Sequence, residues 1–143
     1  MIKVVPSLSS QGWVTSTPRI LEKVISYYIT TDGAQSLVFK DRLINLPTTY
    51  FKNINDPDSM ERALSLDLEE MLGRYFEDSD ILTEVREVKP SEFAILLSIS
   101  VIGADGVKAD LHRVLEMSET GLRNVINISN YGTAKQTLNS LVG

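Results

Sequence analysis

The chain has 143 residues, of which 43% are hydrophobic and 23% charged, and this length and composition fit a single domain with a packed core. Its formal net charge is −5 and it has no basic run, which argues against nucleic acid as a partner because phosphate binding needs clustered Lys and Arg. It has no cysteine, so disulfides, thiolate catalysis and cysteine-bound zinc are excluded. The longest apolar stretch, residues 93–102, is far shorter than the ~20 residues of a membrane helix, and we expect no membrane partner.

Residues 1–16 predict an irregular N-terminal arm, because Pro6 and Gly12 interrupt its short apolar runs. Trp13, the only tryptophan of the chain, lies in this arm. One interpretation is that its side chain folds back on the core. The alternative is that Trp13 anchors a partner, since tryptophan is enriched at the energetic centres of interfaces.

A first amphipathic helix is expected at Thr17 and Pro18, because Thr is a good N-cap and Pro suits the first helical turn. Its apolar positions recur at helical spacing on one face, at Ile20, Leu21, Val24, Ile25 and Tyr28. The pair Asp32-Gly33 predicts the end of this helix. The following stretch is less regular and allows a short strand or a loop at residues 37–39.

The second helix, expected from Asp58 to Phe76, is the clearest element of the sequence. Asp58 is the expected N-cap, and Glu61 in the first turn completes a start that resembles a capping box. One apolar stripe follows this helix, at Met60, Ala63, Leu64, Leu68, Met71, Leu72, Tyr75 and Phe76. A stripe of this spacing is typical of a packed core and not of a cofactor site.

Three alternating segments then predict an antiparallel meander at residues 81–88, 93–102 and 107–117. Residues 93–102 are apolar on both faces, which indicates a central strand covered from both sides. Asp105-Gly106 predicts the hairpin turn that follows. In the last segment one face carries Val107, Ala109, Leu111, Leu115 and Met117. Arg113 interrupts this face, and a bulge or an edge position would explain the interruption.

The sequence therefore predicts an α+β fold, in which two amphipathic helices pack on a small, mainly antiparallel sheet with a three-strand meander and open edges. This domain spans residues 17–117, between the arm at 1–16 and a polar tail at 118–143. The tail allows a short strand around Val125 and a short helix at residues 133–141. Its small polar composition leaves two alternatives: it wraps its own domain, or a partner orders it.

Candidate catalytic chemistry is sparse. His112 is the only histidine and lies near Asp110 on the polar face of an expected strand, where a solvated side chain is expected. Glu69 and Glu70 cannot easily face one substrate, because adjacent helical residues point about 100° apart. The acidic turn at Glu77 lies at a helix C-terminus and lacks the spacing of a calcium loop. We therefore expect no catalytic, metal-binding or cofactor-binding residues, and no enzyme.

Several motifs occur in a distinctive order. An apolar helix ends in Ile29-Thr30-Thr31-Asp32-Gly33, a short segment around Phe39 and a loop ending in Tyr50-Phe51 follow, and the capped helix leads to an acidic turn at Glu77 and the meander. Over residues 17–117 this order resembles the baseplate wedge and sheath-initiator family of contractile phage tails, which includes the matching subunit of type VI secretion systems. Two motifs depart from the family, at Gly33-Ala34-Gln35, where relatives continue Gly-Glu-Arg, and at Glu77-Asp78-Ser79, which keeps only the glutamate of a Glu-Pro-Arg motif.

The resemblance implies a structural baseplate protein that docks on wedge proteins and templates sheath assembly by offering sheet edges to strands of the tail sheath subunits. It also implies a location in the virion tail baseplate, and in the host cytoplasm during assembly, with the tail tube as a further candidate partner. We expect residues 107–117 to be the exposed edge strand. The candidate partner-binding residues are Trp13, Glu77, Val107, Ala109, Leu111, Arg113 and Leu115.

Two other hypotheses stay open at the level of sequence. A tail terminator or completion protein on a related small scaffold would form a ring at the head end of the tail. A glycan hydrolase would act through Glu77 or Glu70 as one of two carboxylates. Native mass spectrometry tests the first hypothesis and a peptidoglycan turnover assay tests the second.

Overall fold

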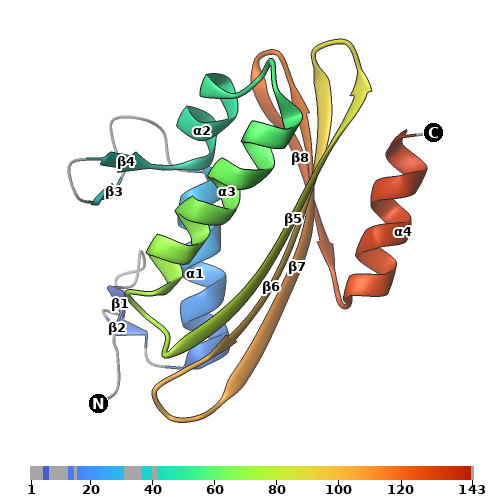
Figure 1. The fold of residues 1–143 in the computed structure, drawn as a ribbon. Helices are drawn as coiled ribbons and strands as arrows, with labels where there is room; N and C mark the ends of the chain where they lie inside the picture. The colour runs from blue at the N-terminus through green and yellow to red at the C-terminus, as the bar shows by residue number, and fades with distance from the viewer. Residues whose placement is uncertain (1–4, 7–12, 15, 31–36, 40–41, 143) are drawn as a thin grey trace.

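The computed structural model describes residues 5–6, 13–14, 16–30, 37–39 and 42–142 (Figure 1). Its centre is a four-stranded antiparallel sheet made of β5 (Asp78–Lys89), β6 (Glu92–Ile102), β7 (Lys108–Ser118) and β8 (Gly121–Ile128), in that order. Two short antiparallel pairs join β1 (Val5–Pro6) to β2 (Trp13–Val14) and β3 (Leu37–Phe39) to β4 (Arg42–Ile44). The predicted α+β fold with an open antiparallel sheet is confirmed.

Helices cover both faces of the sheet (Figure 1). The first face carries α1 (Thr17–Thr30), α2 (Leu46–Lys52) and α3 (Pro57–Leu72), and the second face carries α4 (Tyr131–Val142). The two predicted helices correspond to α1 and α3. Among the residues that the structure describes, no helix combines the length and apolar character that a membrane crossing requires.

Helix α1 begins at Thr17, so Thr17 is not its N-cap as predicted. The backbone carbonyl of Ser16 accepts the first helical hydrogen bond, from Ile20 N–H at 2.9 Å. The Thr17 hydroxyl donates instead to the Asp105 carboxylate at 3.1 Å. The start of α1 is therefore fixed to the hairpin turn between β6 and β7.

Helix α3 begins before its predicted cap. Its N-cap is Asp56, which accepts a hydrogen bond from Ser59 N–H at 3.2 Å, and Pro57 occupies the first helical position. Hydrogen bonds from the hydroxyl and then the backbone of Ser59 lower the pKa of Asp56 below its ordinary value. Asp58 lies inside the first turn. Glu61 closes no capping box, since its carboxylate reaches strand β5.

Strand β6 buries side chains on both of its faces, as the sequence predicted. On the first face it contributes a row of side chains at most 3% exposed, namely Phe93, Ile95, Leu97, Ile99 and Val101. On the second face Ala94 and Leu96 are 0% exposed and belong to a small cluster with Ala134 and Leu138 of α4. A strand buried on both sides is a central strand, and β6 pairs with β5 and β7.

Residues 121–142 continue the sheet beyond the predicted domain boundary at residue 117. Strand β8 pairs with β7, and α4 packs on the second face. Val125 contacts the core of the first face, while Ile126 and Ile128 contact the cluster under α4. Of the two alternatives for this segment, the structure shows the one in which it wraps its own domain.

Arg113 interrupts the apolar face of β7 without a bulge. The register between β6 and β7 is continuous. The irregular pairing lies on the other side of β7, where Glu116 faces Asn124 and Met117 faces Leu122, so the extra residue is Arg123 of β8. Arg113 reaches the Glu22 carboxylate of α1 at 2.6 Å. Val114, on the opposite face, is 0% exposed because it lies in the cluster under α4. The apolar alternation of β7 is therefore interrupted at Arg113 by an ion pair with Glu22, and at Val114 because α4 covers that face.

Asp67 ties the three helices of the first face together. Its side chain is 1% exposed and accepts a hydrogen bond from the Tyr28 hydroxyl of α1 at 2.9 Å. The Thr49 hydroxyl of α2 donates to the same carboxylate oxygen. A buried carboxylate costs free energy unless donors satisfy it, so this arrangement fixes how α1, α2 and α3 sit on one another.

We predict that Asp67→Ala lowers the free energy of unfolding by about 2–4 kcal/mol, because it removes the acceptor of two buried hydroxyl groups. Urea denaturation measures the change. Asp67→Asn keeps a side-chain oxygen at the same place and should lose less. Equal losses in the two variants would show that the hydrogen bonds of Asp67 do not hold the helices.

Candidate interaction edges of the sheet

The outer strands of an open sheet have backbone N–H and C=O groups with no strand beside them, and here the outer strands are β5 and β8. Successive residues of an antiparallel strand direct these groups to opposite sides. Val85 N–H in β5 donates to Glu61 of α3, away from β6. Up to Glu87, where the register shifts, the odd-numbered residues of β5 therefore direct their backbone groups outward.

The orientation of the backbone groups of β8 follows from the pairing of β7 with its two neighbours. In the hairpin between β6 and β7, Gly103 N–H donates to Val107 O at 3.0 Å, so the odd-numbered residues of β7 pair toward β6. Its even-numbered residues pair toward β8, where His112 lies opposite Ile128. It follows that Val125 and Asn127 direct their N–H and C=O groups outward.

The edge of β5 is closed along its middle by α3. The Glu61 carboxylate accepts the outward N–H of Val85 at 2.7 Å and lies 3.7 Å from the Arg86 guanidinium. The Thr83 hydroxyl donates to Glu61 O at 3.1 Å and lies 2.8 Å from the Ser65 hydroxyl. A helix that covers a strand edge in this way prevents another strand from pairing there.

The edge of β8 is open. Within the part of the chain that the structure describes, no strand pairs with its outer side, and the helices that contact β8, α2 and α4, belong to the two faces of the sheet. Arg123 and Asn127 have exposed side chains on this edge. Beyond Ile128 the edge continues on β7, where residues 108–111 have no partner in β8. The open edge of the sheet is therefore formed by β8 and, beyond its end, by residues 108–111 of β7.

Strand β7 is not the outer strand of the sheet, contrary to the prediction from sequence, and of residues 107–117 only the start, residues 108–111, lies at the edge. Strand β7 pairs with β6 along its length and with β8 from His112 to Ser118. The prediction was wrong because the covering strand comes from residues 118–143, whose small polar side chains carry a weak strand signal. The residues that direct backbone groups outward, Val125 and Asn127, were missed for the same reason.

The predicted partner-binding residues of this segment are mostly enclosed. Ala109, Leu111 and Leu115 are at most 8% exposed and belong to the core of the first face, so no partner reaches them in this structure. Arg113 is paired with Glu22, as described above. Val107 is 44% exposed and lies in the turn before β7.

The other two predicted residues are Glu77, near the middle of the chain, and Trp13, near its N-terminus. Glu77 is exposed, and its N–H donates to Ile102 O at 2.9 Å, which starts the pairing of β5 with β6. Trp13 belongs to β2, opposite Pro6 of β1. Both interpretations of the Trp13 side chain lie outside what the structure describes. A partner role for either residue stays a prediction.

The second face of the sheet is covered by α4 over only part of its area, and the remainder carries cross-strand polar pairs. Ser98 Oγ lies 2.8 Å from His112 Nδ1, and the Ser100 hydroxyl donates to Asp110. His112 is 9% exposed, so the expected solvated histidine is wrong. Its ring is shielded because its partners in the register are Ser98 on one side and Ile128 on the other.

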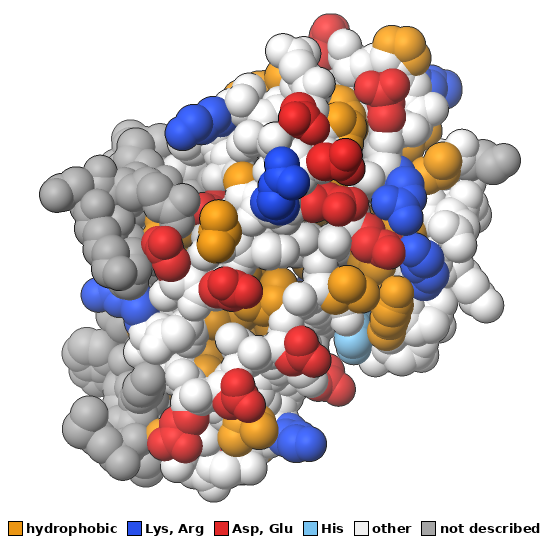
Figure 2. Space-filling model, in the orientation of Figure 1, with side chains coloured by type: hydrophobic (Ala, Val, Ile, Leu, Met, Phe, Trp, Pro, Cys, Tyr) orange, Lys and Arg blue, Asp and Glu red, His pale blue; other side chains and the backbone are white. Residues whose placement is uncertain are grey.

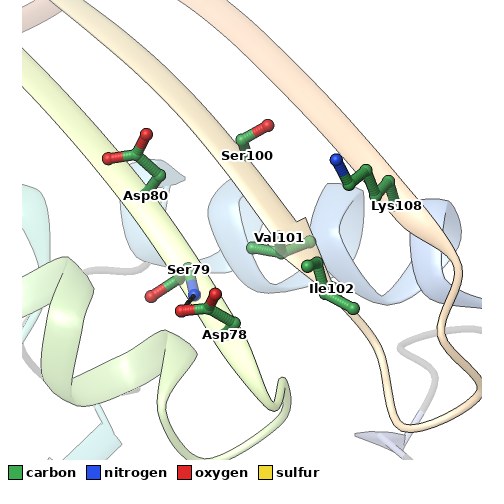
Figure 3. A pocket seen from close by; sticks show the side chains of 7 residues that line it. All are labelled: Asp78, Ser79, Asp80, Ser100, Val101, Ile102 and Lys108. Carbon is green, nitrogen blue, oxygen red and sulfur yellow. Dashed lines mark hydrogen bonds between the residues drawn. The ribbon is translucent and has the colours of Figure 1, made fainter.

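A shallow pocket of about 180 Å³ lies at the uncovered end of this face (Figure 3). Asp80, Ser100 and Lys108 project into it from three neighbouring strands, and Asp78 lies beside them. Across residues 5–6, 13–14, 16–30, 37–39 and 42–142, no group of three or more His, Cys, Asp or Glu side chains is arranged to hold a metal ion. The polar groups that line the pocket are the carboxylates of Asp78 and Asp80, the Ser100 hydroxyl and the Lys108 ammonium group.

Tyr50 fixes α2 to the end of the sheet beside the open edge. Its hydroxyl donates to Ser118 O, at the end of β7, at 2.8 Å. Its ring is 0% exposed and meets Phe93 edge to face, with ring centroids 5.9 Å apart. Burial raises the pKa of Tyr50 to about 12. The phenol consequently remains a hydrogen-bond donor throughout the neutral range.

Comparison of this chain with family models, with curated proteins and with solved structures found no match.

We predict that Glu61→Ala exposes the middle of the β5 edge. Losing the acceptor of the Val85 N–H should lower the free energy of unfolding by about 1–2 kcal/mol. The variant should also self-associate more than the parent protein at high concentration, since an uncovered edge pairs with other strands. Sedimentation velocity measures this. Glu61→Gln keeps an acceptor oxygen and serves as the control; association by Glu61→Gln equal to that of Glu61→Ala would contradict the explanation.

We also predict a specific alkaline instability from Tyr50. Its pKa is about 12 in the folded chain and about 10 when unfolded, so its stabilising contribution is complete below pH ~10 and is lost as the pH rises toward 12. Tyr50→Phe lacks the hydroxyl and should be less stable than the parent at pH 8. Urea denaturation at pH 8 and pH 11 should show the gap between the two proteins narrowing. A gap that widens at pH 11 would refute this explanation.

Proposed function

We propose that this protein is a structural, non-enzymatic subunit of a contractile tail baseplate that docks on wedge proteins and starts sheath assembly by accepting strands of the sheath subunits into its sheet. The observation that carries the proposal is the open edge of β8, a strand of eight residues. The opposite edge is closed by Glu61 and α3. A sheet with one closed and one open edge accepts a new strand on one side only.

The order of elements also supports this proposal. Helices α1 and α3 precede a sheet of consecutive strands, as expected from the resemblance over residues 17–117. The exposed Glu77, which the resemblance singles out, lies at the start of β5, far along the sheet from the β8 edge. Glu77 and the N-terminal arm with Trp13 are therefore assigned to wedge proteins, and β8 to the sheath.

The surface suits a subunit that stays free until assembly. On the side seen in Figure 2, acidic side chains are spread widely with basic ones among them, and no broad basic patch is present there. The net charge of −5 makes copies of the chain repel one another weakly. This repulsion protects an open strand edge from premature pairing while leaving the backbone groups free for a sheath strand.

The proposal predicts that Asn127→Pro abolishes co-purification with the sheath subunit encoded beside this chain. Proline removes the outward N–H of residue 127, whereas the bonds from β8 to β7 are made by its even-numbered neighbours and remain. Asn127→Ala keeps the N–H and should bind like the parent. Circular dichroism checks that both variants are folded.

Three outcomes separate the hypotheses. Loss of sheath binding in Asn127→Pro alone supports strand addition at β8. Equal binding by all three proteins would refute it. A stable ring in native mass spectrometry of the parent protein, with no sheath binding, would instead favour a tail terminator.

A further inference from the structure

Two exposed apolar side chains lie where β8 begins. Phe51, in α2, is 45% exposed, and Leu122, in β8, is 37% exposed. A Cβ atom placed on Gly121 would lie 3.8 Å from Phe51 Cζ, so the Phe51 ring lies against the first residue of β8. Leu122 is paired with Met117, whose side chain belongs to the core of the first face. Because paired residues share a face, Leu122 and Phe51 lie on the same side of the sheet.

Phe51 is held in place by its neighbour. The rings of Tyr50 and Phe51 meet edge to face with centroids 5.2 Å apart. Tyr50 is itself buried and donates a hydrogen bond to Ser118 O at the end of β7. The exposed ring therefore has a fixed support, and a ligand that covers it loses little freedom in the protein on binding.

Single exposed apolar side chains are ordinary on protein surfaces and carry no argument. The other large ones in the described residues are on separate elements: Leu66 on α3, Leu82 on β5, Val107 in the turn before β7 and Val142 on α4. Phe51 and Leu122 differ because they flank an edge with outward backbone groups. The partly buried Val125 extends the same apolar face along β8.

A strand that pairs with β8 places alternate side chains on the two faces of the sheet. On the first face its side chains would lie beside Phe51, Leu122 and Val125. On the second face they would lie beside Asn124 and Ile126, near α4. The first face of β8 therefore favours apolar side chains on an incoming strand, whereas the second face is partly polar. This difference fixes which face of the incoming strand turns toward α2.

We propose that Phe51 and Leu122 form an apolar platform that selects the strand added to β8. The partner it fits is an extended segment with apolar side chains at alternate positions, directed toward α2. This inference rests on the proposed function, because it specifies the strand that the β8 edge accepts. Backbone hydrogen bonds alone would form with a strand of any sequence. The platform adds a preference for strands with apolar side chains on the face toward α2.

The experiment compares three variants for binding to the purified sheath subunit encoded beside this chain, by biolayer interferometry. Phe51→Gln combined with Leu122→Thr removes the platform and keeps every backbone group. Leu66→Gln removes an apolar side chain that is 53% exposed, more than Phe51 or Leu122, beside the closed edge of β5. Asn127→Pro blocks the β8 edge. Thermal unfolding checks that each is folded, and Leu122→Thr alone serves as the platform variant if the double change unfolds.

We expect the platform variant to bind the sheath subunit about tenfold or more weakly, mainly through faster dissociation, and Leu66→Gln to bind like the parent. Loss of binding in Asn127→Pro with no change in the platform variant would overturn the platform and leave the proposed function standing. No change in any variant, or no sheath binding by the parent, would overturn the proposed function itself. A loss caused equally by Leu66→Gln would also overturn the platform, because it would show that exposed apolar side chains act without regard to position.

Discussion

Strand β6 has apolar side chains on both faces, and this single constraint organises the molecule. One covered face would satisfy an ordinary antiparallel hairpin, but β6 also carries Ala94 and Leu96 toward the side away from α1 and α3. Helix α4 covers these two side chains, and β8 precedes α4 in the chain. Strand β8 lies between β7 and α4 in the chain and takes the outer position beside β7, so the open edge lies on β8.

The two edges of the sheet end up different because the helices are distributed unequally. Helix α3 runs beside β5 and places the Glu61 carboxylate on an outward N–H, whereas α2, at the other side, is short and stops at the end of the sheet. It is tied there by Tyr50, so that its last residues lie beside β8 without covering the edge. The sheet therefore has one closed edge, on β5, and one edge free for strand pairing, on β8, with an apolar ring beside it.

Much of this fold could be predicted from the sequence, because strong periodicities mark it. The apolar positions of α1 and the alternation of β6 identified both elements, and Asp105-Gly106 identified the turn, in which Gly106 has φ of 79°. The cap of α3 was misplaced by two residues, since Asp56 and Asp58 are both good caps and only Pro57, at the first helical position, distinguishes them. That signal was present in the sequence.

The candidate site was harder to predict, for physical reasons. The Glu61 carboxylate closes an edge 24 residues further along the chain, and no local pattern encodes such a contact. Strand β8 shows Asn and Arg at its exposed positions, which resembles a loop more than a strand. Burial of His112 depends on its neighbours on two other strands, which are known only once the register is known. Sequence periodicity thus located the elements, whereas pairing between distant elements decided which surfaces stayed free.

The late position of α4 in the chain has a consequence for synthesis. Residues 131–142 must leave the ribosome before the second face of β6 can be covered, so Leu96, Val114 and their neighbours are exposed to other nascent chains until then. The first face can assemble much earlier, because α1 and α3 precede every strand of the main sheet. Folding on the ribosome should therefore pass through a half-covered intermediate, with its unprotected side opposite the helices that are made first.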